Sequence, residues 1–112
     1  MTAQTTPDAH VATLARLGNA LSHEMRARIL LALRRGPARP SDLCERLGAS
    51  KQAMSNQLAC LRGCGLVTAR QVGRGVEYRL GDPRLAHALE DVLGMAVIVD
   101  PACCSGEGCS CR

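Results

Sequence analysis

Two cysteines, Cys60 and Cys64, lie four residues apart in the stretch LACLRGCGLV. If this stretch is helical, both side chains share one face with their Cβ atoms roughly 6 Å apart, so that two sulfurs can reach one ion. Thiolates prefer soft cations, and such a pair suits cadmium, lead, mercury, zinc or copper(I) far better than magnesium or calcium. A lone helical cysteine is most often a small buried hydrophobic residue, and it is the pairing that favours ligation. The spacing therefore predicts that Cys60 and Cys64 are metal ligands.

The other five cysteines stand in different settings. Four of them belong to the terminal stretch PACCSGEGCSCR, which is too rich in glycine and cysteine to pack by itself. An odd total of seven in a reducing compartment favours metal ligation or redox chemistry over a disulfide framework. Cys109 and Cys111 fit an auxiliary thiolate site, an arm that captures metal, or no role at all. Cys44, in DLCERL, is expected to be a buried structural residue.

Composition and charge exclude several classes of protein. The 112 residues predict one domain, and their net charge of +4 is a mild basic excess whose location matters more than its size. No apolar run approaches the roughly 20 residues of a membrane span, and MTAQTTPDAH lacks the features of a secretory signal, so we expect a cytoplasmic protein. An enzyme is the least expected class, because no cysteine is accompanied by a base and an orienting partner.

The elements that position the cysteine pair are predicted to be helices in series. Apolar residues recur at helical spacing over 10–21, and Ser22 is expected to cap a second helix that Gly36 and Pro37 stop. A short helix beginning at Pro40 or Ser41 is expected to end at Gly48, and Ser50 is expected to cap the next helix, which carries the cysteines. Two helices joined by so short a turn indicate a helix-turn-helix. The residues of its second helix expected to face the core are Met54, Leu58 and Leu61.

Two short runs with β-branched residues follow, at 66–72 and 76–80, joined by Gly73-Arg74-Gly75. This pattern predicts a β-hairpin, and a hairpin directly after a helix-turn-helix is a wing. The predicted fold is therefore mainly α: a winged helix-turn-helix of about five helices and a two-stranded hairpin.

The last predicted helix spans 82–99, with Asp82 as its N-cap and Pro83 at its first position. Its apolar stripe is wider than a small monomer can cover, so this helix and the first are expected to form a homodimer interface. The stripe consists of Leu85, Leu89, Val92, Leu93, Ala96 and Val97. The predicted organisation is a flexible N-terminus at 1–9, a DNA-binding and dimerisation domain at 10–99, and a Cys-rich metal-binding tail at 100–112.

This order of elements resembles the ArsR/SmtB repressors, dimeric winged-helix proteins that leave operator DNA when they bind metal. The resemblance covers roughly residues 10–100, and SNQLACLRGCGLV is most similar to the cadmium and lead sensors of the CmtR type. It implies a transcriptional repressor whose effector is cadmium or lead, with zinc, mercury and arsenite as further candidates. In those sensors a third thiolate comes from beyond the last helix, where this chain has Cys103 and Cys104. His23 and His87 do not form the set of ligands that zinc-sensing members carry on the last helix, and are expected to be surface or packing residues.

A DNA-binding surface is expected on the N-terminal part of the helix that carries the cysteines. Such a recognition helix presents its first turns to base edges, where Gln and Asn pair with adenine and Lys with guanine or phosphate. The residues expected to read base edges are Lys51, Gln52, Ser55 and Asn56. Gln57 is expected to reach the DNA backbone, and three arginines on or near the hairpin are further candidates: Arg70, Arg74 and Arg79. Arg74, between two glycines, is free to approach a phosphate or a minor groove.

Two alternatives share this fold. A repressor responsive to arsenite, antimonite or mercury would also use three thiolates, and the adjacent pair Cys103 and Cys104 suits a trivalent metalloid. A thiol-redox regulator would instead oxidise that pair or the other cysteines of the tail in place of binding metal.

Overall fold

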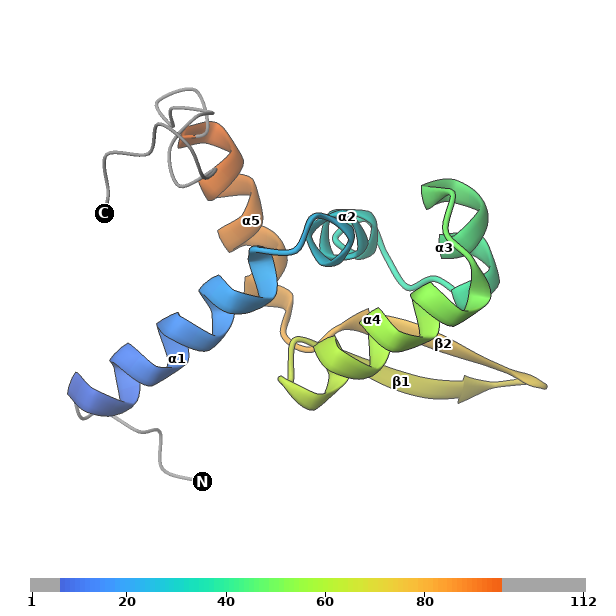
Figure 1. The fold of residues 1–112 in the computed structure, drawn as a ribbon, viewed down its shortest axis with the longest axis horizontal. Coiled ribbons are helices and arrows are strands. Elements are labelled where there is room, and N and C mark those ends of the chain that lie inside the picture. The colour runs from blue at the N-terminus through green and yellow to red at the C-terminus, as the bar shows by residue number, and fades with distance from the viewer. Residues whose placement is uncertain (1–6, 96–112) are drawn as a thin grey trace.

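The computed structural model describes residues 7–95 of the chain, as five helices and one two-stranded sheet. Helices α2, α3 and α4 gather beside the hairpin, whereas α1 and α5 extend away from this group (Figure 1). The predicted winged helix-turn-helix is confirmed. The elements are α1 (Pro7–Leu21), α2 (Glu24–Leu33), α3 (Pro40–Leu47), α4 (Lys51–Gly63), β1 (Val67–Val72), β2 (Gly75–Leu80) and α5 (Pro83–Met95).

The helix-turn-helix is formed by α3 and α4, and the residues at its turn do what the sequence predicted. Gly48 ends α3 in the left-handed conformation with φ of 65°, which costs a glycine little. The hydroxyl of Ser50 accepts a hydrogen bond of 3.1 Å from the N–H of Ala53 and so caps the start of α4. These two caps fix where the recognition helix begins.

The start of α2 differs from the prediction, because the capping residue is His23 and not Ser22. The Nδ1 atom of His23 accepts a hydrogen bond of 3.2 Å from the N–H of Met25. Ser22 is occupied elsewhere, since its hydroxyl donates to the carbonyl oxygen of Asn19 at 2.6 Å and closes the end of α1. The helix also ends at Leu33, before Gly36 and Pro37 are reached.

The hairpin joins β1 and β2 in an antiparallel register that pairs Val67 with Leu80 and Val72 with Gly75. Gly75 is therefore part of β2, and the connection is one residue shorter than the sequence suggested. Tyr78 ties the wing to the rest of the fold by exchanging two backbone hydrogen bonds with Ala38, of 2.8 and 3.0 Å.

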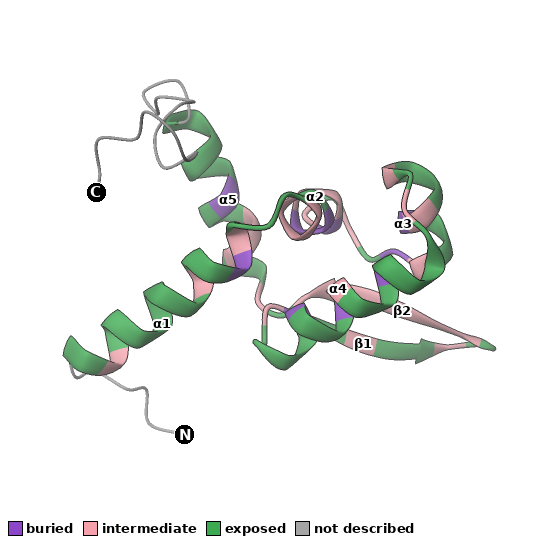
Figure 2. Ribbon diagram, in the orientation of Figure 1, coloured by how far each residue is buried: buried purple, intermediate pink, exposed green. Residues whose placement is uncertain are grey.

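The core lies where α2, α3, α4 and the base of the wing meet. Met54, Leu58 and Leu61 of α4 are buried, as predicted from their spacing. Figure 2 shows buried positions on α2, α3 and α4. Burying one such side chain contributes roughly 1.5–3 kcal/mol, so this face fixes the rotation of α4. The other large side chains that are almost fully buried are Ile29, Leu30, Leu43 and Val67.

Two apolar faces remain uncovered in the single chain. Val11 and Leu14 of α1 are 66% and 67% exposed, and Val92 and Met95 of α5 are both 58% exposed. Leu89 differs from Val92 and Leu93, because it is only 7% exposed and belongs to the core of its own chain, against which the half-buried Leu85 also packs. The predicted interface residues Ala96 and Val97 lie outside the described residues. No helix within residues 7–95 combines the length and apolarity needed to cross a membrane.

Candidate metal site and nucleic-acid interface

The cysteine pair lies at the C-terminal end of α4. Cys60 belongs to the last turn of the helix, and Cys64 follows its last residue, Gly63, with φ of −83° and ψ of −5°. The N–H of Cys64 still donates to the carbonyl oxygen of Cys60 at 3.1 Å, so the helical relation between the two residues is preserved. Both cysteines are exposed and reduced. The pair is therefore open to an ion from solvent.

The sulfur of Cys60 has a neighbour that the sequence did not reveal. An Nη1 atom of Arg26, on α2, lies 2.9 Å from Sγ of Cys60 and donates to it. A second contact joins the same two helices one turn earlier, where Nε2 of Gln57 lies 3.5 Å from Nε2 of His23. No local pattern in the sequence predicts these contacts, because residues 34 positions apart meet only through the packing of α2 on α4.

The described residues supply two candidate ligands and not a complete metal centre. Within residues 7–95 no group of three His, Cys, Asp or Glu side chains is close enough to hold an ion. The pair nevertheless fits a soft cation, because both donors are thiols and both are accessible. The remaining candidates lie outside the described residues; they are Cys103, Cys104, Cys109 and Cys111.

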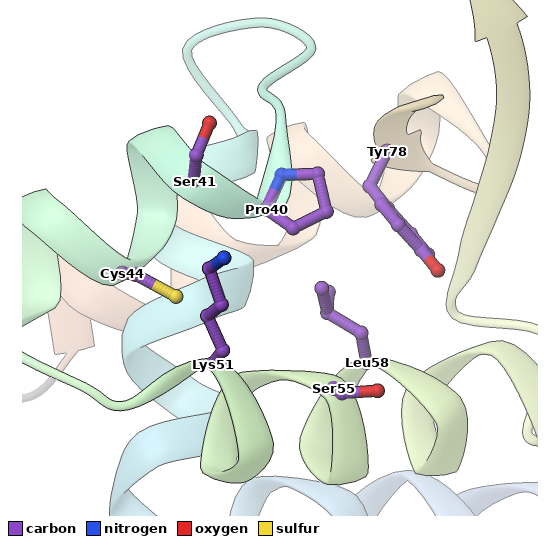
Figure 3. A pocket seen from close by; sticks show the side chains of 7 residues that line it. All are labelled: Pro40, Ser41, Cys44, Lys51, Ser55, Leu58 and Tyr78. Carbon is purple, nitrogen blue, oxygen red and sulfur yellow. The ribbon is translucent and has the colours of Figure 1, made fainter. Parts of the chain in front are cut away.

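Cys44 belongs to a different part of the molecule. It is half-buried and not fully buried as predicted, and its thiol lies 3.7 Å from the carbonyl oxygen of Ser50. Its side chain lines a pocket of about 340 Å³ between α3, α4 and β2, together with Lys51 and Tyr78 (Figure 3). Lys51 begins α4, and Cys60 follows nine residues later, about 13 Å along the helix axis. Cys44 is thus near the opposite end of α4 from the cysteine pair.

The N-terminal half of α4 exposes the side chains expected to read DNA. Lys51, Gln52, Ser55 and Asn56 are all exposed, and the amide of Gln52 donates to that of Asn56 at 3.1 Å. Arg70 and Arg74 are exposed on the hairpin. This surface combines hydrogen-bonding groups and positive charge, as a DNA-binding face requires.

Two of the expected DNA contacts are placed differently. Gln57 is half-buried and faces His23, the N-cap of α2. Arg79 is half-buried as well, and it lines a second cavity of about 500 Å³ beside Leu33, Pro83 and His87. Both side chains are therefore less exposed than the other six residues.

Asp82 caps α5 as predicted. Its Oδ1 atom accepts a hydrogen bond of 2.8 Å from the N–H of Arg84, and the guanidinium of Arg84 approaches Oδ2 at 2.8 Å. The side-chain hydrogen bond from Arg84, aided by the backbone one, lowers the pKa of Asp82 from 3.8 to about 2. The start of α5 is therefore fixed immediately after the wing.

Fold and surface together define a class: a helix-turn-helix with a hairpin wing, whose second helix exposes hydrogen-bonding side chains, is a winged helix-turn-helix DNA-binding regulator. The chain belongs to the ArsR family of bacterial regulatory proteins. Residues 23–69 match the model described as "Bacterial regulatory protein, arsR family". Its relatives are transcriptional regulators and not enzymes.

The HTH-type transcriptional regulator CmtR of Mycobacterium tuberculosis is 48% identical over 87 residues, which cover 78% of this chain and 74% of CmtR. The NMR structure of this "cadmium metal-sensor" superposes with a TM-score of 0.65 over 77% of this chain and 90% of that one. The "Probable mercury resistance operon repressor" of Streptomyces lividans is 35% identical over 91% of this chain and 86% of its own length. The homodimeric winged helix-turn-helix DNA-binding domain of a Mycobacterium bovis protein is 29% identical, with a TM-score of 0.71 over 87% of this chain and 93% of that one.

Proposed function

We propose that this chain is a metal-responsive transcriptional repressor that binds operator DNA in its metal-free form. A soft thiophilic ion, bound by Cys60, Cys64 and either Cys103 or Cys104, releases it from the operator. The observation that carries this proposal is the position of two exposed thiols, one helical turn apart, on the helix whose other end exposes base-reading side chains. A ligand at one end of α4 can therefore act on the other without contacting DNA.

Cadmium or lead is the proposed effector. A thiol-only donor set favours these ions, and a relative with 48% identity bears the description of a cadmium sensor. Mercury is the second candidate, since the Streptomyces lividans relative is described as a mercury resistance operon repressor. Zinc and arsenite also bind thiolates and are further candidate effectors. Thiol oxidation is the alternative mechanism that needs no metal.

The segment around Cys64 is built to transmit a movement. Gly65 follows it with φ of 80°, a conformation that side chains rarely adopt. Next, the carbonyl oxygen of Leu66 accepts a hydrogen bond of 2.9 Å from the N–H of Gly81, just before α5. A side chain at Gly81 would approach the carbonyl oxygen of Gly65 to 2.6 Å, so the two segments are in close contact. Drawing the chain beyond α5 toward Cys60 and Cys64 would therefore act on the end of the recognition helix.

We propose a homodimer formed through α1 and α5. Both helices leave large apolar side chains more than half exposed, and covering them would remove this surface from water. A related winged helix-turn-helix domain is described as homodimeric. The two recognition helices of the dimer would then contact two half-sites of a palindromic operator. We expect the dimer to act in the cytoplasm.

The deciding experiment titrates the metal-free protein with cadmium, lead, zinc, mercury and arsenite in turn, while operator binding is followed by fluorescence anisotropy. The thiolate-to-metal absorption reports ligation in the same cuvette. We expect release by cadmium or lead at the lowest free concentration, and no release when Cys60 and Cys64 are both serine.

The Cys44→Ser variant is the matched control, since it removes one thiol from the same protein without touching the pair. Release by peroxide alone, with no response to any ion, would replace the metal proposal with the redox one. Replacing Cys109 and Cys111 together tests the auxiliary site, because the thiolate-to-metal absorption should fall only if these two cysteines bind metal.

A further inference from the structure

The contact between Arg26 and Cys60 ties the recognition helix to α2. The donor and acceptor atoms are 2.9 Å apart, and the neighbouring contact between His23 and Gln57 repeats the same pairing one turn away. On both helices the two contact residues are three positions apart, so they lie on adjacent turns of facing surfaces. The outer face of α4 is therefore attached to α2 through polar groups, in addition to the apolar core beneath.

Arg26 is held in place and does not extend freely into solvent. It is half-buried, and its Nε atom is buried without a hydrogen-bond partner among residues 7–95. A buried donor without a partner is costly, so the remaining donors of the guanidinium carry the polar interactions of this side chain. One of these donors is directed at the sulfur that the proposed metal site uses.

From this arrangement we infer that Arg26 is a positioning residue that competes with the metal ion for Cys60. The inference rests on the proposed function. A divalent ion bound to Sγ of Cys60 would draw electron density from the sulfur that now accepts the hydrogen bond, and would place a second cation beside the guanidinium, which it repels. Metal binding therefore weakens the hydrogen bond from Arg26 to Cys60, which is one of the polar contacts between α2 and α4.

This exchange gives the metal a direct effect on the DNA-bound form. In the metal-free protein Arg26 helps to hold α4 in the orientation that places its N-terminal half against DNA. When the ion takes Cys60, that contact is weakened and an attachment to the third thiolate forms. Metal binding and operator binding then weaken each other through the side chain of Arg26. This contact supplies part of the coupling between the two sites, which typically changes affinity by about 5- to 150-fold.

The test compares Arg26→Gln with Arg28→Gln. Arg28 lies on the same helix and carries the same charge, but it pairs with Glu24 at 3.4 Å, and its side chain is 54% exposed. Cadmium affinity is measured by competition with a chromophoric chelator, and operator affinity is measured with and without cadmium. We expect Arg26→Gln to bind cadmium more tightly and metal-free operator more weakly, each by about 2- to 12-fold, the net effect of losing one hydrogen bond. Arg28→Gln should shift cadmium affinity far less.

Two further measurements separate positioning from a general loss of structure. Arg26→Lys retains the charge and should restore part of the operator affinity, while thermal unfolding monitors the fold of each variant. Cys60→Ala should weaken metal-free operator binding more than Cys60→Ser, since a serine hydroxyl still accepts a hydrogen bond from Arg26.

The outcomes distinguish this inference from the function on which it rests. If the unmodified protein keeps its operator in the presence of every ion, the proposed function is wrong and the role of Arg26 in metal response is wrong with it. If the unmodified protein responds normally and Arg26→Gln matches Arg28→Gln in cadmium affinity and in release, only the competition is overturned.

Discussion

The two halves of α4 differ in chemistry although they belong to one continuous helix. Its first turns expose an amine, a hydroxyl and two amides, groups that can form hydrogen bonds with bases and phosphates. Its last turn and the residue that follows it expose two thiols, a type of donor that favours soft ions. About 13 Å of helix separates Lys51 from Cys60. In the proposed function, sensing and reading therefore use different residues of one helix, so a variant should be able to lose either property alone.

The largest expected effect is the loss of the dimer and, with it, of operator binding. Replacing Leu14 and Val92 by glutamate places charges on the two exposed apolar faces, and burying a charge there costs several kcal/mol. We expect the dimer to dissociate at micromolar concentration and operator binding to fall by more than 100-fold. Analytical ultracentrifugation measures the first and anisotropy the second. Leu89 is unsuitable for this test because it is buried within its own chain.

Next in size is the loss of sensing alone. The Cys60→Ser, Cys64→Ser double variant should abolish the fall in operator affinity on adding cadmium or lead, a change of roughly 5- to 150-fold in the unmodified protein. Removing Cys103 and Cys104 together should leave weak metal binding without release. If the double variant still left the operator on adding cadmium, the metal would have to act at another site, and the division of α4 into two halves would be wrong.

The complementary variant loses reading alone. Asn56→Ala should weaken operator binding by about 1–3 kcal/mol if its amide pairs with a base, with the loss concentrated at one position of the operator. Cadmium affinity should stay unchanged, because Asn56 lies one turn before Cys60 and contacts Gln52 instead. An equal loss on unrelated DNA would show that Asn56 contacts only the backbone.

A smaller effect is expected from the wing. Arg74 is exposed at the hairpin turn. A plot of the logarithm of operator affinity against the logarithm of salt concentration should become less steep in Arg74→Ala, with its slope reduced by about one for each phosphate contact removed. Arg79→Ala is the matched control, since Arg79 is half-buried beside Leu33 and Pro83. Equal changes in salt slope for both variants would mean that the hairpin contacts DNA differently.

The same division explains what could be predicted from sequence. The spacing of Cys60 and Cys64, the cap at Ser50 and the end of α3 at Gly48 are local features, and helical geometry alone determines them. The contact of Arg26 with Cys60 joins residues 34 positions apart and depends on how α2 packs on α4. Only the packed helices bring these two residues together, so no spacing rule could find them.

The choice of His23 over Ser22 as cap was also beyond local reasoning. Both residue types offer an acceptor near the start of α2, and Ser22 is the more common kind of N-cap. The end of α1 determines which residue caps α2. The hydroxyl of Ser22 donates to the carbonyl oxygen of Asn19, so the N–H of Met25 donates to His23 instead. Neighbouring helices thus compete for the same short connection.

The smallest expected effect lies outside both halves of α4 and tests whether stability and function are independent. Hydrogen bonds from Arg84 lower the pKa of Asp82 to about 2, so its ionised form stabilises the folded chain. Because the folded pKa lies below the ordinary value of 3.8, this stabilisation is present above pH 3.8 and is lost as the pH falls toward 2. Asp82→Ala should therefore lower the unfolding midpoint slightly at pH 7, and its difference from the unmodified protein should narrow below pH 3.8. Cadmium affinity at pH 7 should be the same in both proteins, since Asp82 contacts Arg84 and no thiol among the described residues. A change in cadmium affinity would instead mean that the start of α5 positions the metal ligands, and that sensing extends beyond the end of α4.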